Sequence, residues 1–253
     1  MALKNADQFT FRWLGAAGLE FCFRDKNLLV DPYLTRVSKA KFLFEKIETN
    51  KILLKSLVKK ADGVLVTHAH FDHLLDVPEI IKMTNALVAG SLNTQKILKA
   101  AGVQESKITL VDSKKIINWS EFLVSTKPIT HLKIPGYGYG QIKEAPILPM
   151  RAGKYKMDVD YQYKIQVAGK VFLTEIGKNN LQTDECDVLF LYAFHANKYL
   201  KKVLSRIKTK NIVFIHWDDF FQSLNSPQES LVTKFNRWSL RKTKRFIEKE
   251  FAR

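Results

Sequence analysis

The sequence predicts a mixed α/β protein in which helices cover β-sheets. Strand patterns come as hairpins near the start of the chain, and strands alternate with helical segments further along. The 253 residues are 46% hydrophobic and 26% charged, which allows a packed core and excludes a disordered chain. We expect residues 1–253 to form one domain.

The first segments of the chain alternate apolar and polar residues as strands do. Residues 9–14 and 19–23 flank a glycine-containing turn, which predicts a hairpin. Residues 28–32 are a short buried strand that Pro32 ends. Residues 36–60 place apolar side chains among lysines at helical spacing, so we expect a basic helical insertion there, close to the functional site.

The later segments continue this alternation of strands and helices. Further strands are expected at residues 63–67, 122–126, 129–130, 161–167, 170–174, 187–193 and 212–215. Further helices are expected near Pro78, at residues 94–101, at residues 199–207 and in the tail at residues 229–253. The long irregular stretch over residues 132–157 is of a length that often carries function.

The net charge of +16 is concentrated in two segments. Residues 36–60 and residues 234–253 each contain eight basic and two acidic side chains. Such basicity suits a polyanionic partner, which could be a nucleic acid, a membrane surface or a phosphorylated substrate. Packing of the tail's apolar stripe on the core, with its charges in water, is the plainer interpretation.

The sequence features that report on location favour the cytoplasm. No apolar run reaches the roughly 18 residues of a membrane span, and the first residues lack the apolar core of a signal peptide. Cys22 and Cys186 are too few for a disulfide framework, and both lie in apolar runs. We therefore expect two buried, reduced thiols in a cytoplasmic protein without a transmembrane segment.

Histidines carry the clearest chemical signal in the chain. Three of the six, His68, His70 and His73, lie within residues 67–73 together with Asp72. Imidazole nitrogen and carboxylate oxygen are the ligands that zinc and similar cations take. The segment directly follows a predicted strand, so its side chains can point to two sides of a tight loop.

Two distant histidines have the same placement. His131 and His216 each follow a predicted strand at the point where the strand ends. Strand ends in α/β proteins gather along one edge, where active sites form. One histidine there would usually be structural, but five of them with Asp72 predict a metal centre.

This set of residues resembles the metallo-β-lactamase superfamily. Residues 67–73 resemble its H-x-H-x-D-H signature, and residues 15–18 with the strand ending near Asp31 resemble its opening strands. The resemblance implies an αββα four-layer sandwich with two metal ions at one edge. Within the superfamily, the chain is most similar to the small single-domain lactonases and phosphodiesterase-like hydrolases.

The resemblance also implies two ligand sets for divalent ions, with Zn²⁺ expected and Mn²⁺ or Fe²⁺ as alternatives. The first set is His68, His70 and His131, and the second set is Asp72, His73 and His216. Glu175 stands where the family has a bridging aspartate. Either its longer side chain bridges the two ions, or it turns away and only one ion binds tightly.

Further candidates surround this predicted centre. Asp72 is expected to orient the attacking water. His195 either protonates a leaving group, binds an anionic substrate or is an ordinary loop histidine. Asp31 is expected to support a ligand rather than to bind metal. The candidates for substrate contact are Tyr137, Tyr139, Arg151, Lys154 and Trp217, with a solvated loop and a packed tryptophan as the plainer interpretations.

The sequence thus predicts a metal-dependent hydrolase that acts on a small anionic ester, lactone or phosphodiester. His70 stands where oxygen-reducing di-iron members of the superfamily usually carry a carboxylate, so the resemblance favours hydrolysis over redox chemistry, with a mononuclear iron oxygenase left as an alternative. The same residues also fit an RNA- or DNA-processing nuclease, or a catalytically weak metal-binding protein that contacts membranes peripherally. The sequence leaves the oligomeric state open.

Overall fold

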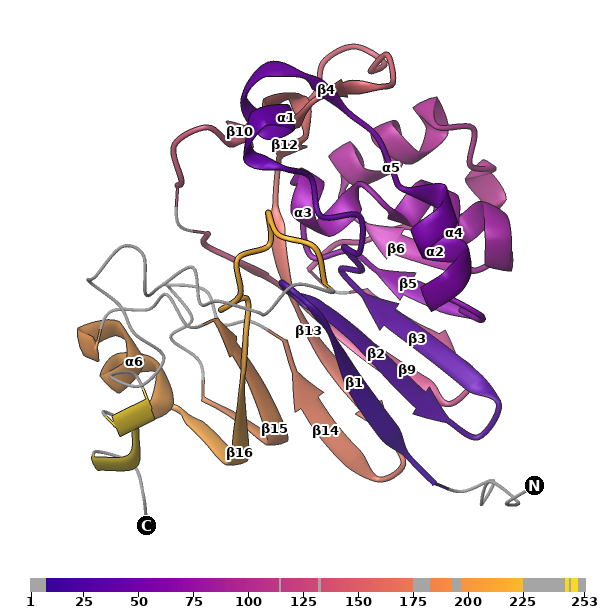
Figure 1. Cartoon of the computed structure of the whole chain (residues 1–253). Helices are drawn as coiled ribbons and strands as arrows, with labels where there is room; N and C mark the ends of the chain where they lie inside the picture. Colours follow the sequence, from indigo (N-terminus) through magenta and orange to yellow (C-terminus); the bar gives the residue numbers. More distant parts are fainter. Residues whose placement is uncertain are drawn as a thin grey trace.

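The computed structural model describes residues 8–113, 115–131, 133–174, 183–192, 197–224, 244–245 and 247–249. Two six-stranded sheets face each other, and helices lie on the outer side of each (Figure 1). The predicted helix over residues 229–253 and the basic segment at residues 234–253 fall largely outside the described residues. No helix in the described part of the chain is long and apolar enough to cross a bilayer.

The first sheet contains the opening strands of the chain. In spatial order its strands are β1 (Thr10–Gly15), β2 (Gly18–Phe23), β3 (Lys26–Val30), β5 (Gly63–Leu65), β6 (Leu87–Gly90) and β7 (Ile108–Leu110). The β1–β2 and β2–β3 pairs are antiparallel, as the alternation predicts, and the pairs from β3 to β7 are parallel. Cys22 lies on this sheet and is half-buried rather than fully buried, whereas Cys186 of the second sheet is buried.

The second sheet is built from the later strands. In spatial order these are β16 (Ile207–Ile215), β15 (Asp184–Tyr192), β14 (Lys170–Leu173), β13 (Asp160–Val167), β9 (Phe122–Ile129) and β8 (Ile116–Trp119). The predicted hairpin is the antiparallel pair β13–β14, while β14, β15 and β16 run parallel. The ends of β5, β9 and β16 are the strand ends at which the sequence places histidines.

Three hydrophobic clusters define the layers. One joins the first sheet to α2 (Lys51–Leu57), α4 (Val77–Thr84) and α5 (Leu92–Ala100), and includes Leu54, Ile80 and Leu98. A second fills the space between the sheets, and a third lies between the second sheet and α6 (Asn197–Leu204). This order of layers is the αββα sandwich that the resemblance implies (Figure 1).

The prediction of one helix over residues 36–60 is wrong. The segment forms α1 (Lys39–Phe44), strand β4 (Lys46–Ile47) and then α2. Pairing between β4 and β11 (Met150–Arg151) separates the two helices, and the side chain of Asn50 starts α2 by accepting a hydrogen bond from the Leu53 amide at 3.1 Å. Ser38 begins α1 in the same way.

The long stretch over residues 132–157 is held by short elements. Besides β11 it contains β10 (Gly138–Tyr139), which pairs in parallel with β12 (Lys156–Met157), and a 3-10 turn, Ala152–Lys154. A second 3-10 turn, Glu105–Lys107, precedes β7. The short α3 (Phe71–Leu74) lies within the predicted metal-binding segment.

Candidate metal centre

The histidines converge at one edge of the two sheets. His68 and His70 lie in the loop between β5 and α3, while Asp72 and His73 lie on α3 itself. The predicted tight loop is therefore partly helical. His131 lies two residues beyond β9 and His216 directly follows β16, so separate strands carry them to the same place.

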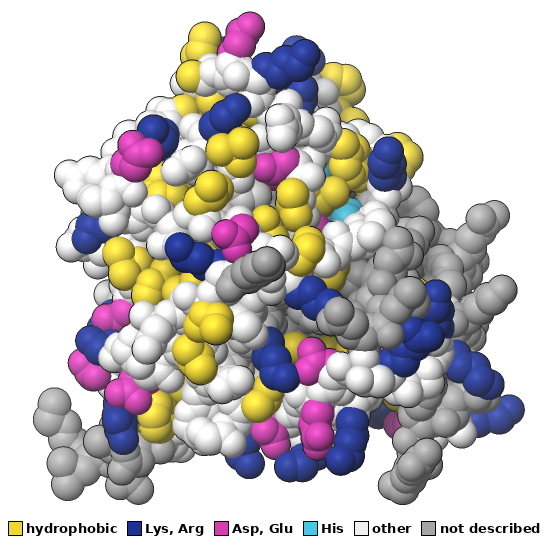
Figure 2. Space-filling view, turned by 180° about the vertical axis from the view of Figure 1, so that it is seen from behind, with side chains coloured by type: hydrophobic (Ala, Val, Ile, Leu, Met, Phe, Trp, Pro, Cys, Tyr) yellow, Lys and Arg dark blue, Asp and Glu magenta, His cyan; other side chains and the backbone are white. Residues whose placement is uncertain are grey.

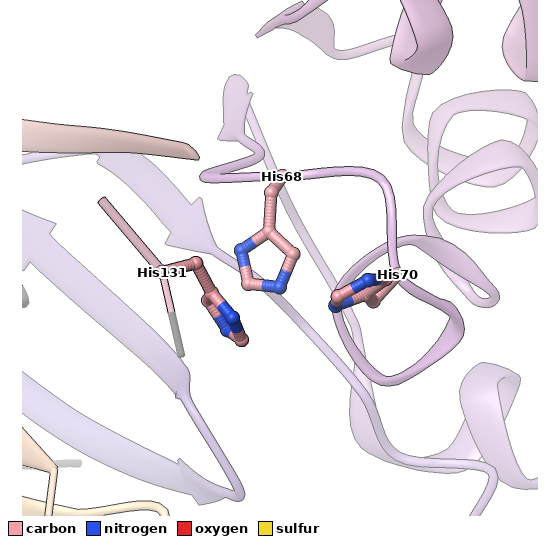
Figure 3. A group of neighbouring side chains, drawn as sticks. All are labelled: His68, His70 and His131. Carbon is pink, nitrogen blue, oxygen red and sulfur yellow. The ribbon is translucent and has the colours of Figure 1, made fainter. Parts of the chain in front are cut away.

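The first group is His68, His70 and His131. Each residue offers one ring nitrogen, and the three nitrogens lie within 4.8 Å of one another. Figure 3 shows the three rings pointing toward a common space, with His68 and His70 on the loop and His131 on the opposite side. His68 and His70 are buried and His131 is half-buried, so the space lies near the surface of the molecule.

Hydrogen bonds orient two rings of this group. Nδ1 of His68 lies 3.2 Å from Oδ1 of Asp160, and Nε2 of His70 lies 3.0 Å from the Gly138 carbonyl oxygen. The other ring nitrogens, Nε2 of His68 and Nδ1 of His70, are buried and have no hydrogen-bond partner among the described residues. Buried polar atoms normally have a partner, and a metal ion supplies one.

The protonation of these rings suits metal binding. Burial lowers the pKa of His70 to about 4. Burial, together with the neighbouring His73, also lowers the pKa of His68 well below its ordinary value. Both rings are therefore neutral near pH 7, which is the state that coordinates a cation.

The second group is Asp72, His73 and His216, whose ligand atoms also lie within 4.8 Å of one another. Oδ2 of Asp72 lies 3.3 Å from Nε2 of His216 and 3.8 Å from Nε2 of His73. Oδ1 of Asp72 is buried and accepts no hydrogen bond from the described residues. Burial acts to raise the pKa of Asp72, but His73 and His216 outweigh it and hold the pKa below its ordinary value.

The two groups adjoin each other. The ring centroids of His68 and His73 are 3.9 Å apart, so one histidine of each group contacts the other group. The donors are imidazole nitrogens and one carboxylate, a set that fits zinc and related divalent ions. On donor chemistry and on the unpartnered buried atoms among the described residues, the two groups fit two such ions.

Asp31, for which the sequence suggests a supporting role, lies behind His73. Its Oδ2 lies 2.9 Å from Nδ1 of His73 and accepts a hydrogen bond from the Thr67 hydroxyl at 2.6 Å, while Oδ1 accepts one from the Thr67 amide at 2.8 Å. The residue adopts a φ of +43°, so the chain bends sharply at the end of β3. These contacts orient His73 toward the second group.

The loop after His131 contributes a wall beside the histidines. The ring of Tyr137 lies 4.8 Å from that of His70, and its hydroxyl donates to Oδ2 of Asp72 at 3.4 Å. Tyr139 lies 5.2 Å from His70. The side chain of Asn93, at the start of α5, fixes this loop through hydrogen bonds with the backbone of Gly140, Ile142 and Lys156.

The remaining candidates lie further out or outside the described residues. Arg151 and Lys154 are exposed on β11 and on the adjoining 3-10 turn. Trp217 stacks on Trp13 with ring centroids 5.0 Å apart, the packed arrangement of the plainer interpretation. Glu175 and His195 are not among the described residues, so their predicted roles remain predictions.

Three contributors to this site are not apparent from the sequence. Asp160 orients His68, the Gly138 carbonyl orients His70, and a buried ion pair joins Arg36 to Asp218 with 2.8 Å between Nη2 and Oδ2. Asp218 also accepts a hydrogen bond from the Ala16 amide at 3.1 Å. These partners are far apart in the chain, and no local motif marks them.

The chain thus has an αββα fold with two adjoining groups of potential metal ligands at one edge of its sheets. A model of the β-lactamase superfamily domain matches residues 26–143. A UPF0173 metal-dependent hydrolase of Flavobacterium johnsoniae is 38% identical over 77 residues, which are 30% of this chain and 29% of that protein. A relative of the same description from Caldivirga maquilingensis is 26% identical over 135 residues, or 53% of this chain and 54% of that protein.

Solved structures support the same fold. Igni18, a metallo hydrolase from Ignicoccus hospitalis, superposes with a TM-score of 0.53 at 17% identity, covering 83% of each chain. A protein from Veillonella parvula superposes with a TM-score of 0.52 at 12% identity, covering 95% of this chain and 91% of its own. The chain is thus similar to the β-lactamase superfamily domain over residues 26–143, and it shares the fold of these solved structures. It spans less than two thirds of the length of the curated relatives it matches.

Proposed function

We propose that this protein is a metal-dependent hydrolase with two divalent ions, expected to be Zn²⁺, that acts on a small anionic ester, lactone or phosphodiester. His68, His70 and His131 would hold one ion, and Asp72, His73 and His216 the other. The observation that carries the proposal is the pair of adjoining donor groups, whose buried, neutral imidazole nitrogens include two without a hydrogen-bond partner among the described residues. The metal-dependent hydrolases among the relatives support it.

Divalent ions in such sites lower the pKa of bound water and polarise a carbonyl or phosphoryl oxygen. The chain's own residues have separate tasks. Asp72 stays ionised beside His73 and His216, so its carboxylate can orient the attacking water as well as bind. Asp160, the Gly138 carbonyl and Asp31 fix the rings of His68, His70 and His73.

Tyr137 and Tyr139 would line the substrate side of the site. Burial raises the pKa of the Tyr137 hydroxyl well above its ordinary value, so it remains a hydrogen-bond donor at neutral pH. A hydrogen-bond donor beside the metal ligands suits an oxygen that gains negative charge during hydrolysis. Exposed Arg151 and Lys154 on the same loop would favour an anionic substrate.

Metal content and turnover test the proposal together. The purified protein, reconstituted with Zn²⁺, should bind two ions and hydrolyse bis-(p-nitrophenyl) phosphate or a small lactone. His70→Ala should lose one ion and turnover, whereas Lys115→Ala, at an exposed position, should keep both and serves as the control. A protein that binds no metal, or a His70→Ala variant with full turnover, contradicts the proposal.

A further inference from the structure

Exposed apolar side chains gather at the end of the molecule formed by α1, β4 and the loop beyond His131 (Figure 1). We call the exposed side chains of residues 39–48 and 133–154 the α1 face. On it the exposed fractions are 59% for Leu43, 71% for Phe44 and 84% for Ile147. Side chains this apolar and this exposed, gathered at one end, mark an interaction surface.

The α1 face is continuous across segments that are distant in sequence. Met150 pairs with Ile47, and Arg151 pairs with Lys46, so the loop with Ile147 runs beside β4. Gly136 approaches the ring of Phe42 so closely that an added Cβ would lie 3.3 Å from it. Figure 2, seen from behind, shows hydrophobic and basic side chains with an acidic one among them at the top of the molecule, the end at which Figure 1 draws α1 and β4.

This face is also basic. It carries seven exposed Lys and Arg side chains against three exposed Glu side chains. One of the lysines has an acidic partner, Lys39 with Asp219 at 3.4 Å. The excess of positive charge persists after this pair is set aside.

We propose that the α1 face docks onto an anionic lipid surface. Exposed apolar side chains among lysines are the pattern by which proteins lie on such a surface, with the apolar groups entering the headgroup region and the cations meeting lipid phosphates. A nucleic acid would match the charge, but it offers no apolar region into which aliphatic Leu43 and Ile147 could insert. A second copy of the chain, meeting this face symmetrically, would place lysines opposite lysines.

The face lies next to the candidate metal centre. Phe42 on α1 packs against Phe71 and Tyr137, with ring centroids 5.4 Å and 6.0 Å apart, and the ring of Tyr137 in turn contacts His70. Docking through α1 would therefore bring the opening beside the histidines close to the lipid surface. The docking proposal stands on the exposed side chains alone and does not depend on hydrolysis.

Flotation of the full chain with vesicles tests the proposal. We expect binding to phosphatidylcholine vesicles that contain about 30% phosphatidylglycerol in about 0.1 M salt, and weaker binding to phosphatidylcholine alone. The double variant Leu43→Ser/Phe44→Ser should lower the vesicle-bound fraction about tenfold. Because α1 contains no buried residue, these substitutions leave the core intact.

The matched control is Ile116→Ser/Leu123→Ser on the second sheet, where the exposed fractions are 66% and 40%. This variant should float like the unaltered protein. Three outcomes overturn the proposal: no flotation of the unaltered protein, equal loss in both double variants, or full flotation of Leu43→Ser/Phe44→Ser. Tight binding to an RNA oligonucleotide without vesicle binding, or a dimer that Leu43→Ser/Phe44→Ser dissociates, would assign the face to those partners instead.

Discussion

The carboxylate of Asp31 holds the ring of His73 from behind, with 2.9 Å between Oδ2 and Nδ1. The same carboxylate accepts hydrogen bonds from the amide and the hydroxyl of Thr67, at 2.8 Å and 2.6 Å. One buried side chain at the end of β3 thus ties the loop after β5 to His73, a candidate metal ligand on α3. This arrangement sets both the tautomer and the direction of the His73 ring.

Removing the charge of Asp31 should weaken the second metal position. We expect Asp31→Asn to lower zinc affinity at that position by about 10- to 100-fold, because a carboxylate behind the imidazole raises its basicity. Competition with a chromophoric chelator measures this change. Asp25→Asn, at an exposed turn residue next to the same strand, is the control and should bind zinc normally; equal affinity in the two variants contradicts the role given to Asp31.

Asp160 should act in the same way on the first position. Its Oδ1 lies 3.2 Å from Nδ1 of His68, a member of the first donor group. Asp160→Asn should therefore weaken the first ion more than the second, the reverse of Asp31→Asn. Cobalt substitution and titration of the absorption bands of the two positions would separate them, and identical titrations for the two variants would refute the assignment.

The buried pair Arg36–Asp218 should be a major source of stability near the site. Both side chains are almost fully buried, and Asp218 also accepts a hydrogen bond from the Ala16 amide. Asp218→Ala would leave the Arg36 charge buried without this partner, so we expect a loss of about 3–5 kcal/mol in the free energy of unfolding. Urea denaturation of Asp218→Ala beside Asp62→Ala, whose carboxylate is partly exposed, measures the difference. Equal losses in the two variants would contradict the role of the buried pair.

Acid should destabilise the metal-free protein through His70. Its pKa is about 4 in the folded protein, against 6.5 for an ordinary histidine, so the unfolded chain binds more protons between these values. The free energy of unfolding is therefore unaffected by His70 above about pH 6.5, and it decreases as the pH falls toward 4. We expect a loss on the order of 2 kcal/mol from about pH 7 to about pH 5, measured by urea denaturation with a chelator present.

The matched variant for this pH effect is His70→Asn, which cannot take up a proton in this range. Its free energy of unfolding should fall less between the same two pH values than that of the unaltered protein. An equal fall in both proteins would place the acid sensitivity elsewhere in the chain.

The elements that the sequence predicts correctly are those whose signals are local. The strands leading to His68, His131 and His216 show as apolar runs, and the order of residues in 67–73 carries the superfamily signature. The fold class follows from these runs together with the resemblance. Both observations depend on neighbours in the chain and not on long-range contacts.

Long-range contacts explain what the sequence does not predict. The single helix over residues 36–60 fails because β4 pairs with β11, far along the chain, and this pairing outweighs the helical spacing. The contact between His68 and Asp160 joins residues 92 positions apart. The sequence does not predict the short strands β6, β7 and β8, because such brief segments carry too little periodicity to be recognised.

Tyr137 should affect turnover more than structure. Its ring packs on Phe71 and lies beside His70, while its hydroxyl donates to Oδ2 of Asp72 at 3.4 Å. Tyr137→Phe keeps the ring and removes the donor, so we expect kcat to fall about tenfold, with zinc content and unfolding temperature nearly unchanged. Tyr155→Phe, which removes the hydroxyl of a buried tyrosine elsewhere in the same loop region, is the comparison and should keep its kcat. If Tyr137→Phe loses zinc in proportion to its activity, the hydroxyl serves to position Asp72 as a ligand and has no separate part in the reaction.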